Sequence, residues 1–419
     1  MKCQSSGRGL LRVCAILLAM ALAAQAHATA GRATAAGVVT DSAGKPVANA
    51  TVLVHSAGVR TGYSIFCPTC YADCGKRAVT DSDGRFTLNA LDDELIFDLL
   101  VIKDGYAPKW IRHVDPQTGP VPALAIDART NVDDPQRGAR GSVVDESGTP
   151  IPYALVQEEG AVFQQDGQWV TGWGSVPGTE ALAVTNAKGE FEIVHGVPAK
   201  RLFVRVSARA KAPTLSSLDT GLVVRKAVSL HDGATIHGRL LNGGKPVPNV
   251  ELGIMVLLRA SGASYPEERV STDAKGRFMF TNVPAGRVWD LYLKAESLGG
   301  RGVLPPTQFA TERDGGDVNV GDLRLQAGVS LSGRVELSDG HAVPVGNRVL
   351  ISAGLGANTQ TVTVGENGTF VVHGLLPGGY LVAASVRGYH PVMGMFNEVL
   401  LKHDVSNYVL RMVPESPAN

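Results

Sequence analysis

The stretch GVVTDSAGKPVANATVLV, from Gly37 to Val54, decides the fold because related stretches follow it three more times. They read GSVVDESGTPIPYALVQ from Gly141, GRLLNGGKPVPNVELGI from Gly238 and GRVELSDGHAVPVGNRVLI from Gly333. In each copy, two apolar runs flank a cluster of turn-forming residues, a pattern that predicts a strand, a tight turn and a second strand. The recurrence at about 100 residues predicts structural units in tandem.

A second signature follows each copy and contains a phenylalanine two residues before its end. It reads AVTDSDGRFTL with Phe86, AVTNAKGEFEI with Phe191, VSTDAKGRFMF with Phe278, and TVTVGENGTFVV with Phe370. The D-x-x-G element predicts a hairpin in which Gly takes a positive φ and Phe returns to the core. The string DSDG, at residues 81–84, lacks the later Glu of a calcium-binding loop, so a hairpin is the preferred interpretation.

Short strands with close turn signals, and no helical period of ten or more residues, predict an all-β chain of sandwiches. We expect four of them in a row, and we number them as units. Unit 1 is expected at residues 31–130, unit 2 at 131–230, unit 3 at 231–325 and unit 4 at 326–419.

The combined signatures resemble the carboxypeptidase regulatory-like domain, a transthyretin-like (prealbumin-like) sandwich. The resemblance rests on G-x-V-x-D-x-x-G-x-P-V-x-x-A-x-V, then T-D-x-x-G-x-F, then x-P-A-G. It is closest at Gly37 to Leu88, at Gly238 to Leu293, and in the second half of the unit at Gly333 to Gly388. Copy two has Asn186 where Asp is usual, and copy four replaces the G-x-P turn with DGHAVP and T-D with VGENG. The resemblance implies four tandem seven-stranded Greek-key sandwiches and an accessory, non-catalytic role.

The first 30 residues predict a cleaved secretory signal peptide. Basic residues (Lys2, Arg8, Arg12) precede the apolar run VCAILLAMALAA and the small-residue sequence AHATA, with cleavage expected after Ala28 or Ala30. No later stretch approaches ~20 apolar residues, so no transmembrane span is expected in the mature chain. We therefore expect an exported protein, periplasmic or secreted to the cell surface, in an oxidising space.

Charge and motifs exclude several classes of function. With 39 basic and 39 acidic residues the formal net charge is zero, so no nucleic-acid partner is expected. None of the ten histidines has Glu three residues later, as the ligand pair of a zinc carboxypeptidase requires, and no H-E-x-x-H, G-x-S-x-G or Walker-type motif occurs. The sequence predicts a non-enzymatic chain without a cofactor, and its histidines are expected at the surface or at strand ends.

Copies one and two carry about ten extra residues between the second strand and the hairpin. In copy one, SIFCPTCYADCGK holds Cys67, Cys70 and Cys74. An exported chain favours a disulfide that closes this loop, and spacing does not choose among the three pairings. Any pairing leaves one thiol. The alternatives are a metal site, with Asp73 or a distant His as further ligand, and a redox or intermolecular role for the remaining cysteine.

In copy two, the extra residues read AVFQQDGQWVTGWGSVPGTEAL and include Phe163, Gln168, Trp169 and Trp173. Indole rings beside amide groups suit sugar rings and also protein partners. The competing interpretation is that the aromatic residues fold back over a sandwich edge. The sequence therefore predicts a structural or binding protein of the cell envelope, with an unknown protein or glycan partner. Carbohydrate binding at the copy-two loop is one alternative, and a metal or redox role of the cysteine loop is the other.

Overall fold

The computed structural model describes residues 31–60, 68–130, 133–174, 181–258, 263–264, 268–344, 346–352, 360–392 and 397–415. The predicted signal peptide and Cys67 lie outside these residues. The predicted all-β fold is confirmed, since the described helical segments are only the four-residue α2 (Ala295–Leu298) and the 3-10 turn η1 (Glu366–Gly368). Among the described residues, no helix combines the length and apolar character that crossing a membrane requires.

Unit 1 consists of two sheets, with strand orders β4-β1-β7 and β3-β2-β5-β6. Strand β1 pairs antiparallel with β4 and parallel with β7. The strands are β1 (Arg32–Asp41), β2 (Thr51–Val59), β3 (Arg77–Val79), β4 (Arg85–Asp92), β5 (Leu95–Ile102), β6 (Lys109–Val114) and β7 (Leu124–Ile126).

Unit 2 repeats this arrangement, with orders β12-β8-β15 and β10-β9-β13-β14. Strand β9 has two partners along the same edge: its residues 155–157 pair with β11, and its residues 160–165 pair with β10. The strands are β8 (Gly138–Val144), β9 (Leu155–Gln165), β10 (Gln168–Trp173), β11 (Leu182–Val184), β12 (Glu190–Val194), β13 (Ala199–Ser207), β14 (Thr214–Asp219) and β15 (Gly221–Ser229).

Unit 3 has sheets β17-β16-β22, in which β25 also pairs with β16, and β21-β18-β23-β24, and it adds the pair β19-β20. The strands are β16 (Ala234–Asn242), β17 (Lys245–Pro246), β18 (Glu251–Met255), β19 (Leu257–Leu258), β20 (Ala263–Ser264), β21 (Glu268–Ser271), β22 (Arg277–Val283), β23 (Arg287–Leu293), β24 (Thr307–Thr311) and β25 (Asp317–Arg324).

Unit 4 has sheets β29-β26-β33-β31 and β28-β27-β30-β32. The strands are β26 (Val329–Leu337), β27 (Arg348–Ser352), β28 (Gln360–Thr363), β29 (Thr369–Leu375), β30 (Gly378–Ser385), β31 (Tyr389–Pro391), β32 (Asn397–Leu401) and β33 (Val405–Pro414). In all four units the first strand thus has two neighbours. It pairs antiparallel with the strand that carries the phenylalanine of the second signature, and parallel with the last strand of the unit.

Each unit has a hydrophobic core of its own. Four clusters of buried side chains fall within the four expected ranges, apart from the partly buried Leu215 of unit 2, which packs against the cluster of unit 3. Strand β4 shows the alternation that produces such a core, because Phe86 and Leu88 are buried while their neighbours are exposed. Burying one such side chain contributes about 1.5–3 kcal/mol, so each cluster is a substantial source of stability.

A buried threonine connects the two sequence signatures in three units. In unit 1, Thr80 Oγ1 accepts from the Ala50 N–H at 2.8 Å and donates to the Val47 carbonyl at 2.7 Å. Thr185 and Thr272 make the same two bonds in units 2 and 3. This threonine, which comes directly before the turn of the second signature, therefore fastens that turn to the turn that precedes the second strand of the unit.

The D-x-x-G turn forms in unit 1, but the predicted hairpin does not: the strands before and after this turn, β3 and β4, pair in different sheets, and the same holds for their counterparts in the other units. Asp81 Oδ1 accepts from the N–H groups of Asp83 and Arg85 at 2.9 and 2.8 Å, and Gly84 has φ +71°. The carboxylate is thus used by its own turn, which leads the chain from one sheet of the sandwich to the other.

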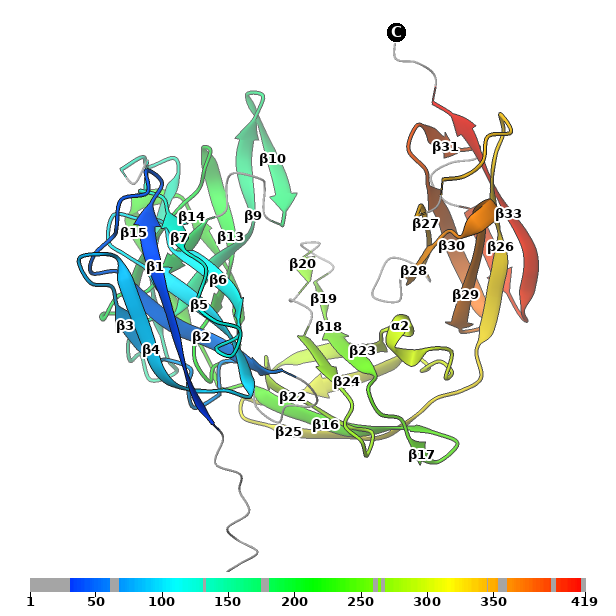
Figure 1. The fold of residues 1–419 in the computed structure, drawn as a ribbon, viewed down its shortest axis with the longest axis horizontal. Coiled ribbons are helices and arrows are strands. Elements are labelled where there is room, and N and C mark those ends of the chain that lie inside the picture. The colour runs from blue at the N-terminus through cyan, green and yellow to red at the C-terminus, as the bar shows by residue number, and fades with distance from the viewer. Residues whose placement is uncertain are drawn as a thin grey trace, which may run out of the picture.

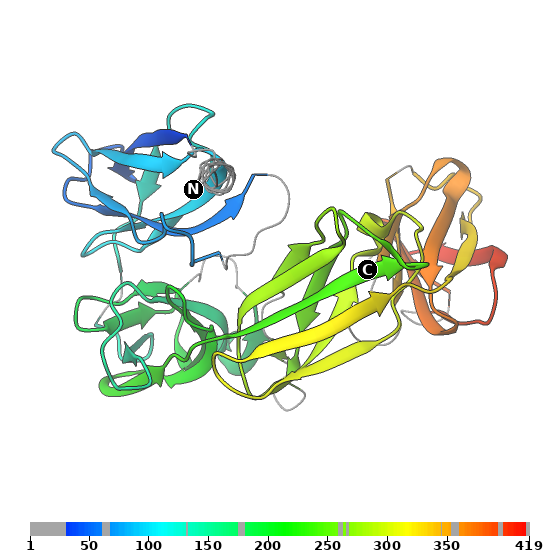
Figure 2. The ribbon, with the colours of Figure 1, turned by 90° about the horizontal axis from the view of Figure 1, so that it is seen from below.

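The units are arranged in an arc in Figure 1, in which units 1 and 2 lie at one end, unit 3 in the middle and unit 4 at the other end. Figure 2, turned by 90°, shows that units 1 and 2 lie side by side.

Candidate functional site

The insertion of copy two lengthens a sheet. Strand β9 turns through Asp166 and Gly167, both at positive φ (+50° and +76°), into β10, and Gln165 is opposite Gln168. Two such residues form the turn that best matches the twist of a hairpin. Figure 1 shows the β9–β10 hairpin protruding beyond the body of unit 2. The Asp-Gly pair between apolar runs was the sequence signal for this hairpin, which the sequence interpretation treated as a loop.

Alternation along β10 separates the predicted binding residues. Trp169, Thr171 and Trp173 project to the outer side of the sheet, and each tryptophan is 41% exposed. Phe163 lies on the other side, where it is 8% exposed and belongs to the core cluster of unit 2. Gln168 is exposed at the start of β10. Of the predicted aromatic residues, the structure brings the two tryptophans to one face and places Phe163 inside.

A glycine allows an aromatic stack on this outer side. Gly160 of β9 is opposite Trp173 on one neighbouring strand and opposite Phe203 on the other. Because Gly160 has no side chain, the rings of Trp173 and Phe203 meet above it, with centroids 4.5 Å apart and planes at 23°. A Cβ at Gly160 would come within 3.1 Å of the Trp173 ring.

Charged groups surround these rings. The Lys200 Nζ lies 4.2 Å from the Trp169 ring centroid, in a cation–π arrangement. Arg201 pairs with Asp219 at 2.7 Å, and Arg205 pairs with Glu159 at 2.8 Å. We call Trp169, Thr171, Trp173 and Phe203, with Lys200 and Arg201 beside them, the aromatic face.

The cysteine loop of copy one is built into the core of unit 1. Tyr71 and Cys74 are buried and belong to its hydrophobic cluster. Cys74 is a free thiol, whereas Cys70 is disulfide-bonded; Cys67 lies outside the described residues. Burial raises the pKa of Cys74 to about 11, which keeps the thiol protonated at neutral pH.

Asp73 fixes the loop from inside. Its side chain is nearly inaccessible, accepts a hydrogen bond from the Asp92 N–H at 2.7 Å and pairs with Lys76 at 2.5 Å. The backbone of the loop joins β2 through Gly75 N–H to the Val54 carbonyl at 2.8 Å. The carboxylate considered above as a metal ligand is therefore used for holding the loop on the sandwich.

The same loop contacts the other units. The Asn282 amide of unit 3 donates to Cys70 Sγ at 3.6 Å. Arg209 of unit 2 lies close enough that a Cβ at Gly75 would be 3.5 Å from its guanidinium. The insertion of copy one thus lies at the place where units 1, 2 and 3 meet.

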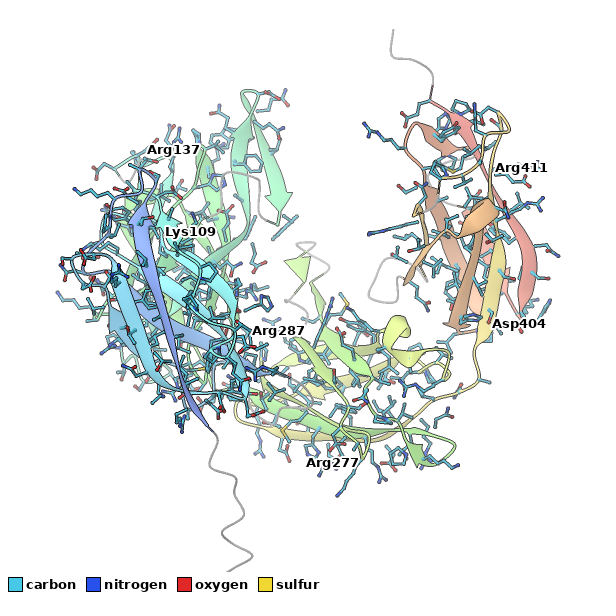
Figure 3. All side chains as sticks on the ribbon, viewed as in Figure 1. Lys109, Arg137, Arg277, Arg287, Asp404 and Arg411 are labelled. Atoms are coloured by element: carbon cyan, nitrogen blue, oxygen red, sulfur yellow. The ribbon has the colours of Figure 1, made fainter. Side chains whose placement is uncertain are left out.

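Unit 2 contains a buried ionisable pair that the sequence does not predict, although its histidine lies at a strand end as expected. His195 follows directly after β12 and is completely buried; its Nε2 lies 3.1 Å from Oε1 of the buried Glu158. Its Nδ1 lies 2.8 Å from the Val197 carbonyl. Arg137, labelled in Figure 3, donates to the adjacent Gly196 carbonyl. Because Glu158 is 37 residues away in the sequence, no local motif indicated the pair.

Comparison with known proteins gives no family for this chain. No protein-family model matches it, and no curated protein does. Solved structures that resemble it include a streptococcal ancillary pilin, with 14% identity over 67% of this chain and 100% of the pilin and a TM-score of 0.22. The Bacillus anthracis TIE protein (10% identity, 96% and 78% covered, TM-score 0.19) and a minor pilin of Streptococcus agalactiae (10% identity, 45% and 98% covered, TM-score 0.22) are others. We draw no functional conclusion from similarity at these TM-scores.

Proposed function

We propose that this chain is an exported, non-catalytic binding protein of the cell envelope that contacts a protein partner through the aromatic face of unit 2. The observation that carries the proposal is the pair Trp169 and Trp173, each 41% exposed on one side of a sheet whose other side is core. Tryptophan and arginine are enriched where protein partners meet.

The scaffold supports a non-catalytic role. The same two-sheet strand order recurs in all four units, as expected for tandem carboxypeptidase regulatory-like domains divided at residues 130, 230 and 325. That family assignment and export are proposals that rest on the sequence signatures and on the predicted signal peptide.

We assign the cysteine loop an internal structural role, with Cys67 and Cys70 as the disulfide. The supporting observations are that Cys70 is bonded, and that Cys74 is free and buried in the core. A nucleophilic or metal-binding cysteine needs a lowered thiol pKa, and burial raises that of Cys74. The loop also contacts units 2 and 3, which suits a joint between units.

The experiment places a photo-crosslinking amino acid at Thr171, which is exposed between the two tryptophans on β10. The mature chain is irradiated in envelope extract of its own organism, and crosslinked proteins are identified by mass spectrometry. We expect one dominant adduct. Its yield should fall at least tenfold in the double variant Trp169→Ala, Trp173→Ala. Leu400→Ala, which removes a 63% exposed side chain from unit 4, should leave the adduct unchanged. An adduct with equal yield in the tryptophan variant would refute the proposal.

A glycan is the second candidate ligand. The planar rings of Trp169 and Trp173 lie beside the Arg201–Asp219 pair and the exposed Gln164, which offer the donors and acceptors that sugar hydroxyl groups require. Glycan-array binding that disappears in the same double variant would favour this candidate over a protein partner. Absence of saturable glycan binding would exclude it.

A further inference from the structure

Three ionisable side chains converge where unit 2 meets unit 3. His231 Nδ1 lies 3.0 Å from Asp314 Oδ2 and 3.5 Å from Glu146 Oε1. One ligand atom from each of the three residues lies within 4.8 Å of the others. The side chains are 42–48% exposed, so the cluster is open to ions from solvent. We propose that Glu146, His231 and Asp314 bind a divalent metal ion of the zinc class and thereby tie unit 2 to unit 3.

The backbone holds the three residues from separate segments. Glu146 is in the turn after β8, where Asp145 Oδ1 accepts from the N–H groups of Ser147 and Thr149. The His231 carbonyl accepts from the Ala212 N–H at 2.9 Å. Asp314 is in the turn between β24 and β25, and that turn is fixed by the Thr235 N–H, which donates to the Gly316 carbonyl at 2.8 Å. Little rearrangement of the backbone is therefore needed to coordinate an ion.

The two distances from His231 Nδ1 also fit a shared metal ion. A proton on His231 Nδ1 forms a hydrogen bond with one carboxylate at a time. A metal ion placed between the three side chains would bind the imidazole and both carboxylates together. Zinc bonds of about 2.0–2.1 Å in a tetrahedron place neighbouring ligand atoms about 3.3 Å apart, between the two distances measured here. Three protein ligands leave the fourth position for water.

The surrounding charge also favours a cation. Asp145 and Asp232 lie beside the cluster, and the Asp232 N–H donates to Glu146 Oε1 at 3.2 Å. Lys211 pairs with Asp232 at 2.7 Å and also interacts electrostatically with Glu146 and Asp145, so one positive charge faces three carboxylates beside or within the cluster. An imidazole ligand selects zinc and similar transition metals over magnesium and calcium, which prefer oxygen ligands alone.

The test titrates the mature full chain with zinc chloride by calorimetry. We expect one saturable site per chain, with at least a tenfold loss of affinity in His231→Ala and in Asp314→Asn. His237→Ala is the matched control, because His237 faces only the Asp317 carboxylate, at 3.2 Å, and its zinc affinity should equal that of the wild type. Magnesium chloride, titrated in the same way, should give no saturable binding at this site.

A second measurement tests the link between the units. Spin labels at Lys188 and Lys275, exposed on units 2 and 3, report the distance between them. Zinc should narrow the distance distribution in the wild type and leave it unchanged in Asp314→Asn, a variant that retains the shape of the side chain. The proposal is overturned if zinc binds without saturation, if the variants bind as tightly as the wild type, or if zinc does not alter the wild-type distribution. Near-ultraviolet circular dichroism confirms that each variant is folded.

Discussion

Gly37 of β1 is directly opposite Phe86 of β4, and a Cβ at Gly37 would come within 2.9 Å of the Phe86 ring. The pairing recurs as Gly141 with Phe191, Gly238 with Phe278 and Gly333 with Phe370. The opening glycine of the first signature and the phenylalanine of the second are therefore cross-strand partners. Glycine leaves room beside the phenylalanine ring as it packs into the core.

Gly37→Ala should destabilise unit 1 by about 1–3 kcal/mol, because the added methyl group overpacks the contact with Phe86 and Val121. Hydrogen exchange of peptides from β4 and β5 measures this loss within the full chain. Gly58→Ala is the control, since no atom lies within 4 Å of a Cβ at that position of β2. Equal protection in the two variants would show that the close approach at Gly37 has no energetic consequence.

Thr272→Val should cost unit 3 about 1–3 kcal/mol, because the Val250 N–H and the Val247 carbonyl would lose their buried partner. Thr272→Ser retains the hydroxyl and should recover most of the loss. Hydrogen exchange of peptides from β18 and β22 measures the stability of unit 3, which is compared between the wild type and the two variants. If serine were as destabilising as valine, packing of the threonine methyl would be the cause instead of the hydrogen bonds.

Much of the fold was predictable because its determinants are local and repeated. The turn residues, the D-x-x-G turns and the alternating strands are each specified within a few neighbouring residues, whereas the sequence did not reveal that each of these turns joins two different sheets. The unit 4 sequence departs from T-D, and the buried Val364 takes the position of the threonine. The side-chain amide of Asn347 donates to the Pro344 carbonyl at 2.7 Å, in place of the bond that the threonine hydroxyl donates to the Val47 carbonyl in unit 1.

The sites were less predictable because they depend on contacts between distant segments. Trp169 and Trp173 are exposed because alternate residues of β10 face outward. The Asp166–Gly167 turn sets this alternation, so it could have been derived from the sequence. The stack of Trp173 on Phe203, the Glu158–His195 pair and the cluster of Glu146 with Asp314 each join residues far apart in the sequence. Their proximity is a consequence of strand order, which no single motif contains.

Cys74 should resist alkylation by iodoacetamide in the native chain at about pH 8, because its thiol is buried and its raised pKa, about 11, leaves little thiolate. In denaturant, without reductant, one thiol per mature chain should become labelled. Mass spectrometry locates the label, and Cys74→Ala should abolish it. Rapid native labelling, or three labelled thiols in denaturant, would contradict the proposed arrangement of the loop.

The pair of His195 and Glu158 should make the stability of unit 2 depend on pH. Burial lowers the pKa of His195, but the adjacent Glu158 carboxylate and the Val197 carbonyl outweigh this effect, so the pKa lies above its ordinary value of 6.5. Arg137 opposes this shift. Because the folded-state pKa is the higher one, the stabilisation is complete below pH 6.5 and is lost as the pH rises through the folded-state pKa.

Exchange protection of β9 and β13, corrected for intrinsic exchange rates, should accordingly be greater at about pH 6 than at about pH 9. His195→Gln removes the titrating group and should make the protection independent of pH over this range. Glu158→Gln should lower stability by about 3–5 kcal/mol at acidic pH, because it leaves the imidazolium buried without a counter-charge. The peptides of β27 and β30 in unit 4 serve as the internal control. A wild-type profile that rises with pH would contradict the assigned direction of the shift.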